Sequence, residues 1–293
     1  MSARTWYALF KTMRPKQWVK NAIVFAGLFF DRQLFEPRAF LSTLAGFILF
    51  CLLSSLVYII NDLSDVQADR LHPLKRHRPL AAGELPVRVA QAAMLGLLLI
   101  IFPLAYLLSP VFCSVALLYF LLNLGYSRWF KHMPILDVLV LASFYLIRVG
   151  AGVVLIQVTY FSPWLYVFTT FLALFLGVGK RRAELNLLAE GANSHRKVLE
   201  GYTLPLLDQL ITIVSTLTVV TYSLYTFSAH NLPENHAMML TIPFVIYGIF
   251  RYLYLVQARQ SGGAPEDVLF TDRSLQITLL MWGLAVLLIF YIT

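Results

Sequence analysis

Charge is scarce in this sequence. Asp, Glu, Lys and Arg make up 13% of its 293 residues, against roughly 25% in an average soluble domain. A soluble fold of this size needs a charged surface, so the shortage excludes one. Apolar types reach 59% of the chain, and they gather in runs of about twenty residues, the length that crosses a hydrocarbon core about 30 Å thick. The sequence therefore predicts a multi-pass membrane protein.

Cysteine is nearly absent, and several common site motifs are missing. Cys51 and Cys113 both lie inside apolar runs, where a thiol is typical of buried packing and not of a disulfide or a metal site. The sequence contains no Cys/His metal spacing, P-loop, GxGxxG or GxSxG. The first twenty residues carry five Lys or Arg with no small-residue cleavage site after them, so we expect no cleavable signal peptide.

The apolar residues form nine segments. These are too long for barrel strands and lack strict alternation, so we expect helices, the other structure that satisfies its backbone in lipid. The predicted fold is all-α: one polytopic membrane domain over residues 1–293, a bundle of nine transmembrane helices. The predicted spans are 18–35, 39–61, 86–108, 110–129, 134–157, 162–179, 205–229, 238–258 and 274–292.

The first segment is the shortest, because its purely apolar core covers only residues 22–30. The N-terminal arm and the loop 62–88 are both basic, so both should be cytoplasmic. An even number of crossings must then separate them, which requires that the first segment spans the membrane. The alternative is an interfacial helix over residues 6–20 followed by a re-entrant dip.

The distribution of basic residues predicts the orientation. Of the 23 Lys and Arg, nineteen fall at predicted cytoplasmic positions, two in outer loops, and two, Arg148 and Arg251, within helices. Such an asymmetry indicates a cytoplasmic N-terminus and, with nine crossings, a C-terminus outside. We expect a multi-pass protein of the cell (inner) membrane whose active site faces the cytoplasm.

Four polar residues follow the second segment at helical spacing. Asn61, Asp65 and Asp69 lie four residues apart and share one face if the helix continues, with Asp62 one position round. Carboxylates at this spacing repel one another, and acids at a helix C-terminus oppose its dipole. A hard cation removes the conflict, and carboxylate and amide oxygens suit Mg²⁺. The alternative is a solvated, acidic helix end.

A basic run follows directly. Arg70, Lys75, Arg76 and Arg78 come after the carboxylates, and Pro73, Pro79 and Gly83 shape the loop. Arginine makes forked contacts to phosphate oxygens, and lysine supplies a point charge. Beside a cation site these residues favour a phosphorylated or pyrophosphorylated substrate. Taken alone, the run is also typical of an ordinary positive-inside loop or of an anionic-lipid contact.

These two stretches carry a family resemblance. Asn-Asp-x-x-Asp-x-x-x-Asp over residues 61–69, followed by His-Pro-x-Lys-Arg-x-Arg-Pro-Leu-Ala-Ala-Gly over 72–83, resembles the first signature of the UbiA superfamily of intramembrane prenyltransferases. The resemblance implies nine transmembrane helices and a Mg²⁺–diphosphate site on the cytoplasmic side.

A stretch further along the chain differs from the pattern in the family's prenyl branch. Where that branch has a second Asp-rich motif, this chain has Lys180-Arg181-Arg182-Ala-Glu184. A Lys-Arg-x-x-Glu sequence here is similar to the polyprenyl-phosphate (decaprenyl-phosphate) phosphoribosyltransferase subgroup, although Lys180 and Glu184 could also form a plain surface pair. Further stretches agree with that subgroup, at residues 14–21, 126–131, 134, 137, 145–152, 265–267 and 272–275.

The resemblance implies a reaction. A polyprenyl phosphate attacks the anomeric carbon of 5-phosphoribosyl 1-pyrophosphate, pyrophosphate leaves, and the product serves cell-envelope polyprenyl-sugar synthesis. Because the nucleophile is already an anion, stabilisation of the leaving charge should dominate catalysis. A nearby carboxylate could stabilise the oxocarbenium-like transition state, by analogy with glycosidases.

The site residues follow as a hypothesis. Mg²⁺ on the pyrophosphate is expected at Asn61, Asp62, Asp65 and Asp69. Phosphates are expected at Lys75, Arg76, Arg78, Lys131, Lys180 and Arg181. Lys20 and Asn21 should lie near the lipid or sugar phosphate, Glu184, Asp272 and Arg273 near the ribose, and Tyr126 within the substrate site. Arg148, near mid-helix, either pairs with an acid or reaches the lipid phosphate. The catalytic set is Asp62, Asp65, Asp69 and Glu184.

Two other functions stay open. One is a prenyltransferase that joins a prenyl diphosphate to an aromatic acceptor, against which the single Asp-rich motif counts. The other is a lipid-phosphate transporter or scaffold, against which the clustering of charges at one face counts. The expected partners are phosphoribosyl pyrophosphate, a polyprenyl phosphate and the bilayer, with no nucleic acid. The prenyl chain length and the oligomeric state, a homo-oligomer included, are not indicated.

Overall fold

A computed structural model describes residues 2–73, 75–156, 158, 162–189, 197–229, 232–257 and 265–292. These residues form helices and connecting loops with no strand among them, so the predicted all-α class is confirmed. The chain divides into two compact units. Unit 1 comprises residues 1–128 and 147–158, and unit 2 comprises 129–146 and 159–293. The single domain expected from the sequence stays a prediction.

Eight helical stretches within the described residues are long and apolar enough to cross a membrane. They match the second to ninth predicted segments, and their ends differ by a few residues except in the sixth. That helix runs to Ala189 instead of ending at residue 179, so Lys180 and Glu184 lie within it and not after it. In unit 1 they are α3 (Pro37–Ser64), α5 (Val87–Leu108) and α6 (Pro110–Arg128), while α7 (Leu136–Val153) runs through both units. In unit 2 they are α8 (Pro163–Ala189), α9 (Leu204–Ser228), η5 (Ala237–Thr241) with α10 (Ile242–Gln257), and α12 (Arg273–Ile292).

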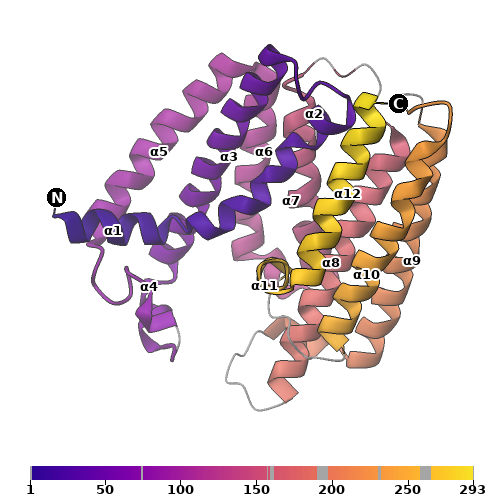
Figure 1. Cartoon of the computed structure of the whole chain (residues 1–293). Helices are drawn as coiled ribbons and strands as arrows, with labels where there is room; N and C mark the ends of the chain where they lie inside the picture. Colours follow the sequence, from indigo (N-terminus) through magenta and orange to yellow (C-terminus); the bar gives the residue numbers. More distant parts are fainter. Residues whose placement is uncertain are drawn as a thin grey trace. The chain divides into compact units, whose positions relative to one another are not determined.

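The first predicted segment folds differently. It forms a 3₁₀ helix, η1 (Pro15–Phe25), followed by the short α2 (Ala26–Phe30). A 3₁₀ helix rises about 2.0 Å per residue, so the two pieces together extend about 30 Å. That length suffices for a crossing, which stays a prediction. A separate helix, α1 (Ala3–Thr12), precedes it and lies crosswise to α3 and α5 (Figure 1).

A glycine explains how η1 packs in unit 1. A side chain at Gly152, in α7, would place its Cβ 1.8 Å from the carbonyl oxygen of Val24 in η1. The two backbones can therefore approach only because residue 152 has no side chain.

One buried cluster in unit 1 packs α1 against α3 and α5. Ala8 and Leu9 of α1 pack with Ile59 of α3, with Leu80 and Leu85 of the following loop, and with Ala90 of α5. This cluster fixes the loop that carries the basic run. Deeper in the unit, Phe50 makes edge contacts with Phe112 and Tyr119 of α6.

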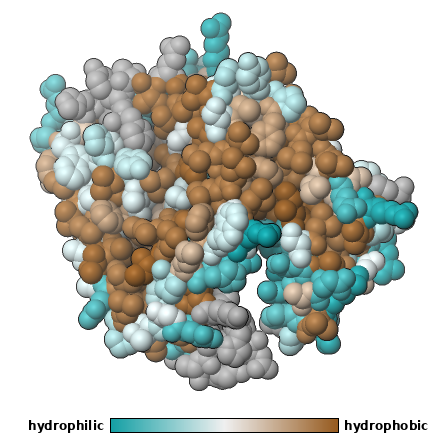
Figure 2. All heavy atoms as spheres, turned by 180° about the vertical axis from the view of Figure 1, so that it is seen from behind, coloured by the Kyte–Doolittle hydropathy of each residue, from teal (hydrophilic) through white to brown (hydrophobic). Residues whose placement is uncertain are grey.

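In unit 2, α8 packs against α9, and α10 packs against α8, α9 and α12. Phe175 of α8 and Tyr252 of α10 meet edge to face in the core, with ring centroids 5.1 Å apart. Large apolar side chains such as Leu240 and Leu280 remain exposed, and apolar side chains cover most of the face drawn in Figure 2. Surfaces of this kind are suited to lipid contact.

Candidate functional site

The acidic motif lies where α3 ends. Asp65 closes α3 with φ −96° and ψ 2°, and the short α4 (Val66–Leu71) starts after it. The backbone N–H of Asp65 donates to the Asn61 carbonyl (2.9 Å), and that of Asp69 donates to the Asp65 carbonyl (2.8 Å). The helical spacing therefore continues across the interruption. Asp62 and Asp69 are buried, and Asn61 and Asp65 are half-buried.

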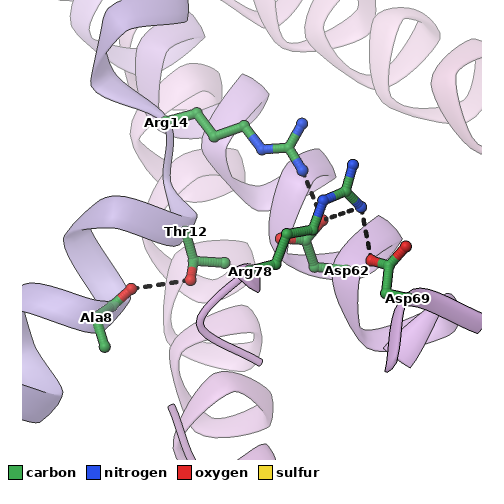
Figure 3. A network of polar contacts seen from close by, with 6 residues as sticks. All are labelled: Ala8, Thr12, Arg14, Asp62, Asp69 and Arg78. Atoms are coloured by element: carbon green, nitrogen blue, oxygen red, sulfur yellow. Dashed lines mark hydrogen bonds and ion pairs between the residues drawn. The ribbon is translucent and has the colours of Figure 1, made fainter. Parts of the chain in front are cut away.

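Asp62 and Asp69 converge on one guanidinium (Figure 3). Arg78 Nη1 donates to Asp62 Oδ1 at 3.2 Å and to Asp69 Oδ2 at 2.7 Å. These acids are seven residues apart, which is two helical turns, so they share a face. The i,i+4 spacing had grouped Asp69 with Asn61 and Asp65, with Asp62 one position round the helix. The i,i+7 spacing was the signal for the pair that the structure brings together.

The loop anchors Arg78 in this position. Leu80 and Leu85 are almost fully buried. The N–H of Ala82 donates to the Arg78 carbonyl (2.8 Å), and the N–H of Leu85 donates to the Pro79 carbonyl (3.0 Å). Gly83 closes the turn with φ +77°, a conformation that favours glycine.

Arg14 is a second cation at Asp62, and the sequence analysis did not include it among the site residues. Its Nη2 donates to Asp62 Oδ1 at 2.7 Å, and its guanidinium lies 4.5 Å from the centroid of the Tyr58 ring. Arg14 follows the end of α1, where the Thr12 hydroxyl donates to the Ala8 carbonyl (Figure 3). Its backbone is left-handed, with φ 53°, directly before Pro15. No local spacing connects residue 14 with residue 62, so only the tertiary fold reveals this contact.

The acid pair fits one kind of metal site. Magnesium is usually bound by one or two carboxylates and completes its shell with water and substrate phosphates. Among the described residues, no group of three or more His, Cys, Asp or Glu side chains could hold a metal ion. Two converging carboxylates therefore match the number of protein ligands that a magnesium ion commonly has.

Exposed cations lie near the pair in sequence. Lys75 and Arg76, in the 3₁₀ turn η2 (Lys75–His77), are exposed. The N–H of Lys75 donates to His72 Nδ1 (3.3 Å), and the N–H of Arg76 donates to the His72 carbonyl (3.1 Å). Their side chains are therefore open to a phosphate from solution.

A buried polar cluster lies further along unit 1. Arg148 Nε donates to Asn21 Oδ1 at 2.7 Å, and its Nη2 donates to the Tyr119 hydroxyl at 2.6 Å. The Asn21 amide in turn donates to Ser54 Oγ at 3.0 Å. The structure thus brings together Asn21 and Arg148, two predicted site residues. Lys20, next to Asn21, is half-buried, as is Tyr126 near the end of α6.

Unit 2 holds a buried charged network around Arg181. Its Nε donates to Asp137 Oδ2 and its Nη1 donates to Glu184 Oε2, each at 2.5 Å. Arg181 and Asp137 are buried, while the Glu184 side chain is 19% exposed. Arg181 is thus held between two carboxylates and in turn holds Glu184, and its contact with a phosphate stays a prediction.

Tyr202 completes this network. Its hydroxyl donates to Asp137 Oδ1 (2.6 Å) and accepts from the Ile135 N–H (2.6 Å). Burial, followed by the hydrogen bond to the Asp137 carboxylate, raises the pKa of Tyr202 well above its ordinary value. Tyr202 lies outside the charged motifs, so no pattern in the sequence marks it as a site residue.

The remaining predicted residues of unit 2 have different surroundings. Asp272 accepts from the Leu275 N–H (2.8 Å) at the start of α12, and its carboxylate pairs with Arg251 (2.7 Å). Arg273 is exposed, whereas Lys131 and Lys180 are half-buried. The side chains of residues 265–267, one of the stretches that agree with the phosphoribosyltransferase subgroup, lie outside those that the structure describes.

Comparison with known proteins defines the family. Residues 22–273 match the UbiA prenyltransferase family. The chain is 35% identical to the decaprenyl-phosphate phosphoribosyltransferase of Corynebacterium glutamicum over 291 residues, covering 97% of this chain and 87% of that protein. It is 36% identical to the decaprenyl-phosphate phosphoribosyltransferase of Mycolicibacterium smegmatis over 290 residues, covering 94% and 89%.

The fold agrees with this match. A UbiA homologue from Archaeoglobus fulgidus bound to GPP and Mg²⁺ superposes with a TM-score of 0.72 at 18% identity, covering 97% of this chain and 99% of that one. The chain therefore belongs to the UbiA prenyltransferase family and is a multi-pass membrane enzyme. The resemblance to the phosphoribosyltransferase subgroup is confirmed by the identity along nearly the whole chain.

Proposed function

We propose that the protein transfers 5-phosphoribose from 5-phosphoribosyl 1-pyrophosphate to a polyprenyl phosphate in the cell membrane, on its cytoplasmic side. The observation that carries the proposal is the 35% identity to a decaprenyl-phosphate phosphoribosyltransferase over 97% of the chain. The sequence Lys180-Arg181-Arg182-Ala-Glu184 supports it, since one acid stands here in place of a second Asp-rich motif.

The reaction forms one bond and breaks one. A phosphate oxygen of the polyprenyl phosphate bonds to the anomeric carbon, with inversion, while the bond from that carbon to the pyrophosphate oxygen breaks. The nucleophile is an anion, so no strong base is needed, and the barrier depends on stabilising the leaving charge. Mg²⁺, when bound, supplies positive charge to that pyrophosphate.

In unit 1, Asp62 and Asp69 would hold the ion, with Asn61 and Asp65 as further ligands. Lys75 and Arg76, exposed beside this motif, would bind pyrophosphate oxygens, as arginine and lysine commonly do. Asn21 and Arg148, joined at 2.7 Å, would with Lys20 bind the lipid phosphate.

In unit 2, we assign Glu184 to the ribose. Its carboxylate is held by Arg181 and remains partly exposed, so it can accept a hydrogen bond from a sugar hydroxyl or stabilise positive charge on the ring. Lys180 and Lys131 would contact the 5-phosphate, and Arg273 and Asp272 the rest of the sugar.

The experiment is a choice of substrates. Purified protein is incubated with Mg²⁺, labelled phosphoribosyl pyrophosphate and decaprenyl phosphate, and in a second reaction with a prenyl diphosphate and 4-hydroxybenzoate. We expect a phosphoribosylated lipid and released pyrophosphate in the first reaction. Product in the second reaction alone would identify a prenyltransferase instead. Saturable binding of phosphoribosyl pyrophosphate without pyrophosphate release would indicate a transporter or scaffold.

A further inference from the structure

The two arginines at the acid pair are not equivalent. Asp62 Oδ1 is contacted by Arg14 at 2.7 Å and by Arg78 at 3.2 Å. Within the part of the chain that the structure describes, Asp69 forms one ion pair, with Arg78 at 2.7 Å. If Arg78 moved away, Asp62 would keep its second arginine and Asp69 would lose its counter-charge.

A divalent ion on this pair must compete with Arg78. Magnesium requires oxygen ligands at about 2.0–2.1 Å in nearly ideal geometry, and one nitrogen of Arg78 now lies between the same two oxygens. If Arg78 left with no cation in its place, the buried Asp69 carboxylate would be uncompensated beside Asp62, which is costly. The exchange of one cation for the other avoids that cost.

We propose that Arg78 and the divalent ion bind the Asp62–Asp69 pair in turn, while Arg14 holds Asp62 in place throughout. The proposal rests on the metal–diphosphate site of the proposed function. An arginine released from the carboxylates can turn to the oxygens of the incoming pyrophosphate, which it binds in a forked geometry. The ion and the diphosphate therefore enter together, and Arg78 links the two events.

The surroundings of each arginine suit these roles. Arg14 stacks on Tyr58 and has a left-handed backbone fixed next to Pro15, so its position depends on several elements at once. The two side chains are similarly exposed, at 31% for Arg14 and 28% for Arg78, so the difference lies in their contacts: in the described residues, the ion pairs of Arg78 are those with the two carboxylates. Arg14 is thus a positioning residue, and Arg78 is the exchanging one.

The test measures Mn²⁺ binding to the full-length purified protein in detergent without substrate, from the paramagnetic resonance signal of the free ion. In R78Q the ion no longer displaces a guanidinium, so we expect its affinity to rise at least about tenfold over wild type. R76Q is the matched control, because it removes the same charge from an exposed position two residues away. R14Q should bind Mn²⁺ no more tightly than R76Q.

Several results would overturn the proposal. Equal affinities of R78Q and R76Q would show that only the net charge matters, and loss of binding in R78Q would show that Arg78 supports the site. A gain in R14Q as large as that in R78Q would make the two arginines equivalent. If R78Q does not fold, R78M, which keeps an unbranched side chain but removes the nitrogen that contacts both carboxylates, should bind Mn²⁺ more tightly than wild type, and an unchanged affinity there contradicts the exchange.

This measurement is separate from the proposed function. If the wild-type protein phosphoribosylates the lipid but substitution of Arg78 does not change Mn²⁺ affinity, the proposed function stands and the exchange is wrong. If the protein uses only a prenyl diphosphate but R78Q still binds Mn²⁺ more tightly, the proposed function is wrong and the exchange stands. The exchange can hold in both cases because phosphoribosyl pyrophosphate and a prenyl diphosphate both carry a diphosphate.

Discussion

Arg78 and Arg181 show how far residue identity alone defines a role. Both are arginines that the sequence assigns to phosphate, yet the Arg181 side chain is 1% exposed between two carboxylates and that of Arg78 is 28% exposed. The partners of Arg181 are Glu184, three residues further along the same helix, and Asp137, in another helix. The pairing with Asp137 leaves no pattern in the sequence. The composition and spacing predicted a phosphate site, and the tertiary structure adds the carboxylate partners and the burial of each arginine.

The acid pair gives the first prediction at this scale. D69N removes one of the two carboxylates that converge on Arg78, so we expect Mg²⁺-dependent turnover to fall at least about 100-fold. D65N should also abolish metal-dependent turnover if Asp65 is a ligand. E84Q changes an exposed acid in the same loop and serves as the control. Initial rates at increasing Mg²⁺ check this, and wild-type rates in D69N or in excess EDTA would remove the metal site.

Tyr202 gives a prediction about pH. Its pKa is raised in the folded protein, so its stabilising effect is fully present below the unfolded pKa of about 10 and is lost as pH rises through the folded value. Y202F leaves Asp137 short of one donor, which costs about 1–3 kcal/mol. The difference in thermal midpoint between Y202F and wild type should stay constant from pH 6 to 9 and shrink only at higher pH. Y7F, at an exposed tyrosine, is the control, and a difference that already shrinks between pH 6 and 9 would contradict the assignment.

At the scale of elements, hydrophobic length predicted most of the helices. Eight of the nine expected segments are helices of spanning length, because a long apolar run has few other structures in lipid. The first segment differs because packing decides it: η1 lies against Gly152, more than a hundred residues away along the chain. The interruption of the helix at Asp65 was likewise not predicted. The spacing of Asn61, Asp65 and Asp69 is that of a continuous helix, and the backbone hydrogen bonds do continue across the interruption.

The packing of η1 can be tested with two glycines of one helix. In G152A the new Cβ would lie 1.8 Å from the Val24 carbonyl oxygen, whereas a Cβ at Gly150 meets nothing within 4 Å. We expect G152A to lower the thermal midpoint strongly or to prevent folding. G150A should be neutral or slightly stabilising, by up to about 1 kcal/mol, because alanine favours the helix. Size-exclusion profiles and thermal midpoints of the two variants check this, and equal stability would contradict the close approach.

At the scale of the whole molecule, the charge asymmetry predicts the topology. Residues 15–30 extend about 30 Å, so we expect them to cross the membrane and make nine crossings, with the N-terminus in the cytoplasm and the C-terminus outside. A C-terminal alkaline phosphatase fusion should be active, and a C-terminal green fluorescent protein fusion should be dark. A fluorescent C-terminal fusion would mean an even number of crossings and would place η1 at the interface.

The central claim is that the sugar phosphate, and not the prenyl group, is transferred from a diphosphate. Mass spectrometry of the lipid formed from labelled phosphoribosyl pyrophosphate, decaprenyl phosphate and Mg²⁺ tests it most directly. We expect a decaprenyl-phosphoryl phosphoribose that carries the label, with one pyrophosphate released per lipid. No labelled lipid from an active preparation that prenylates an aromatic acceptor would contradict it.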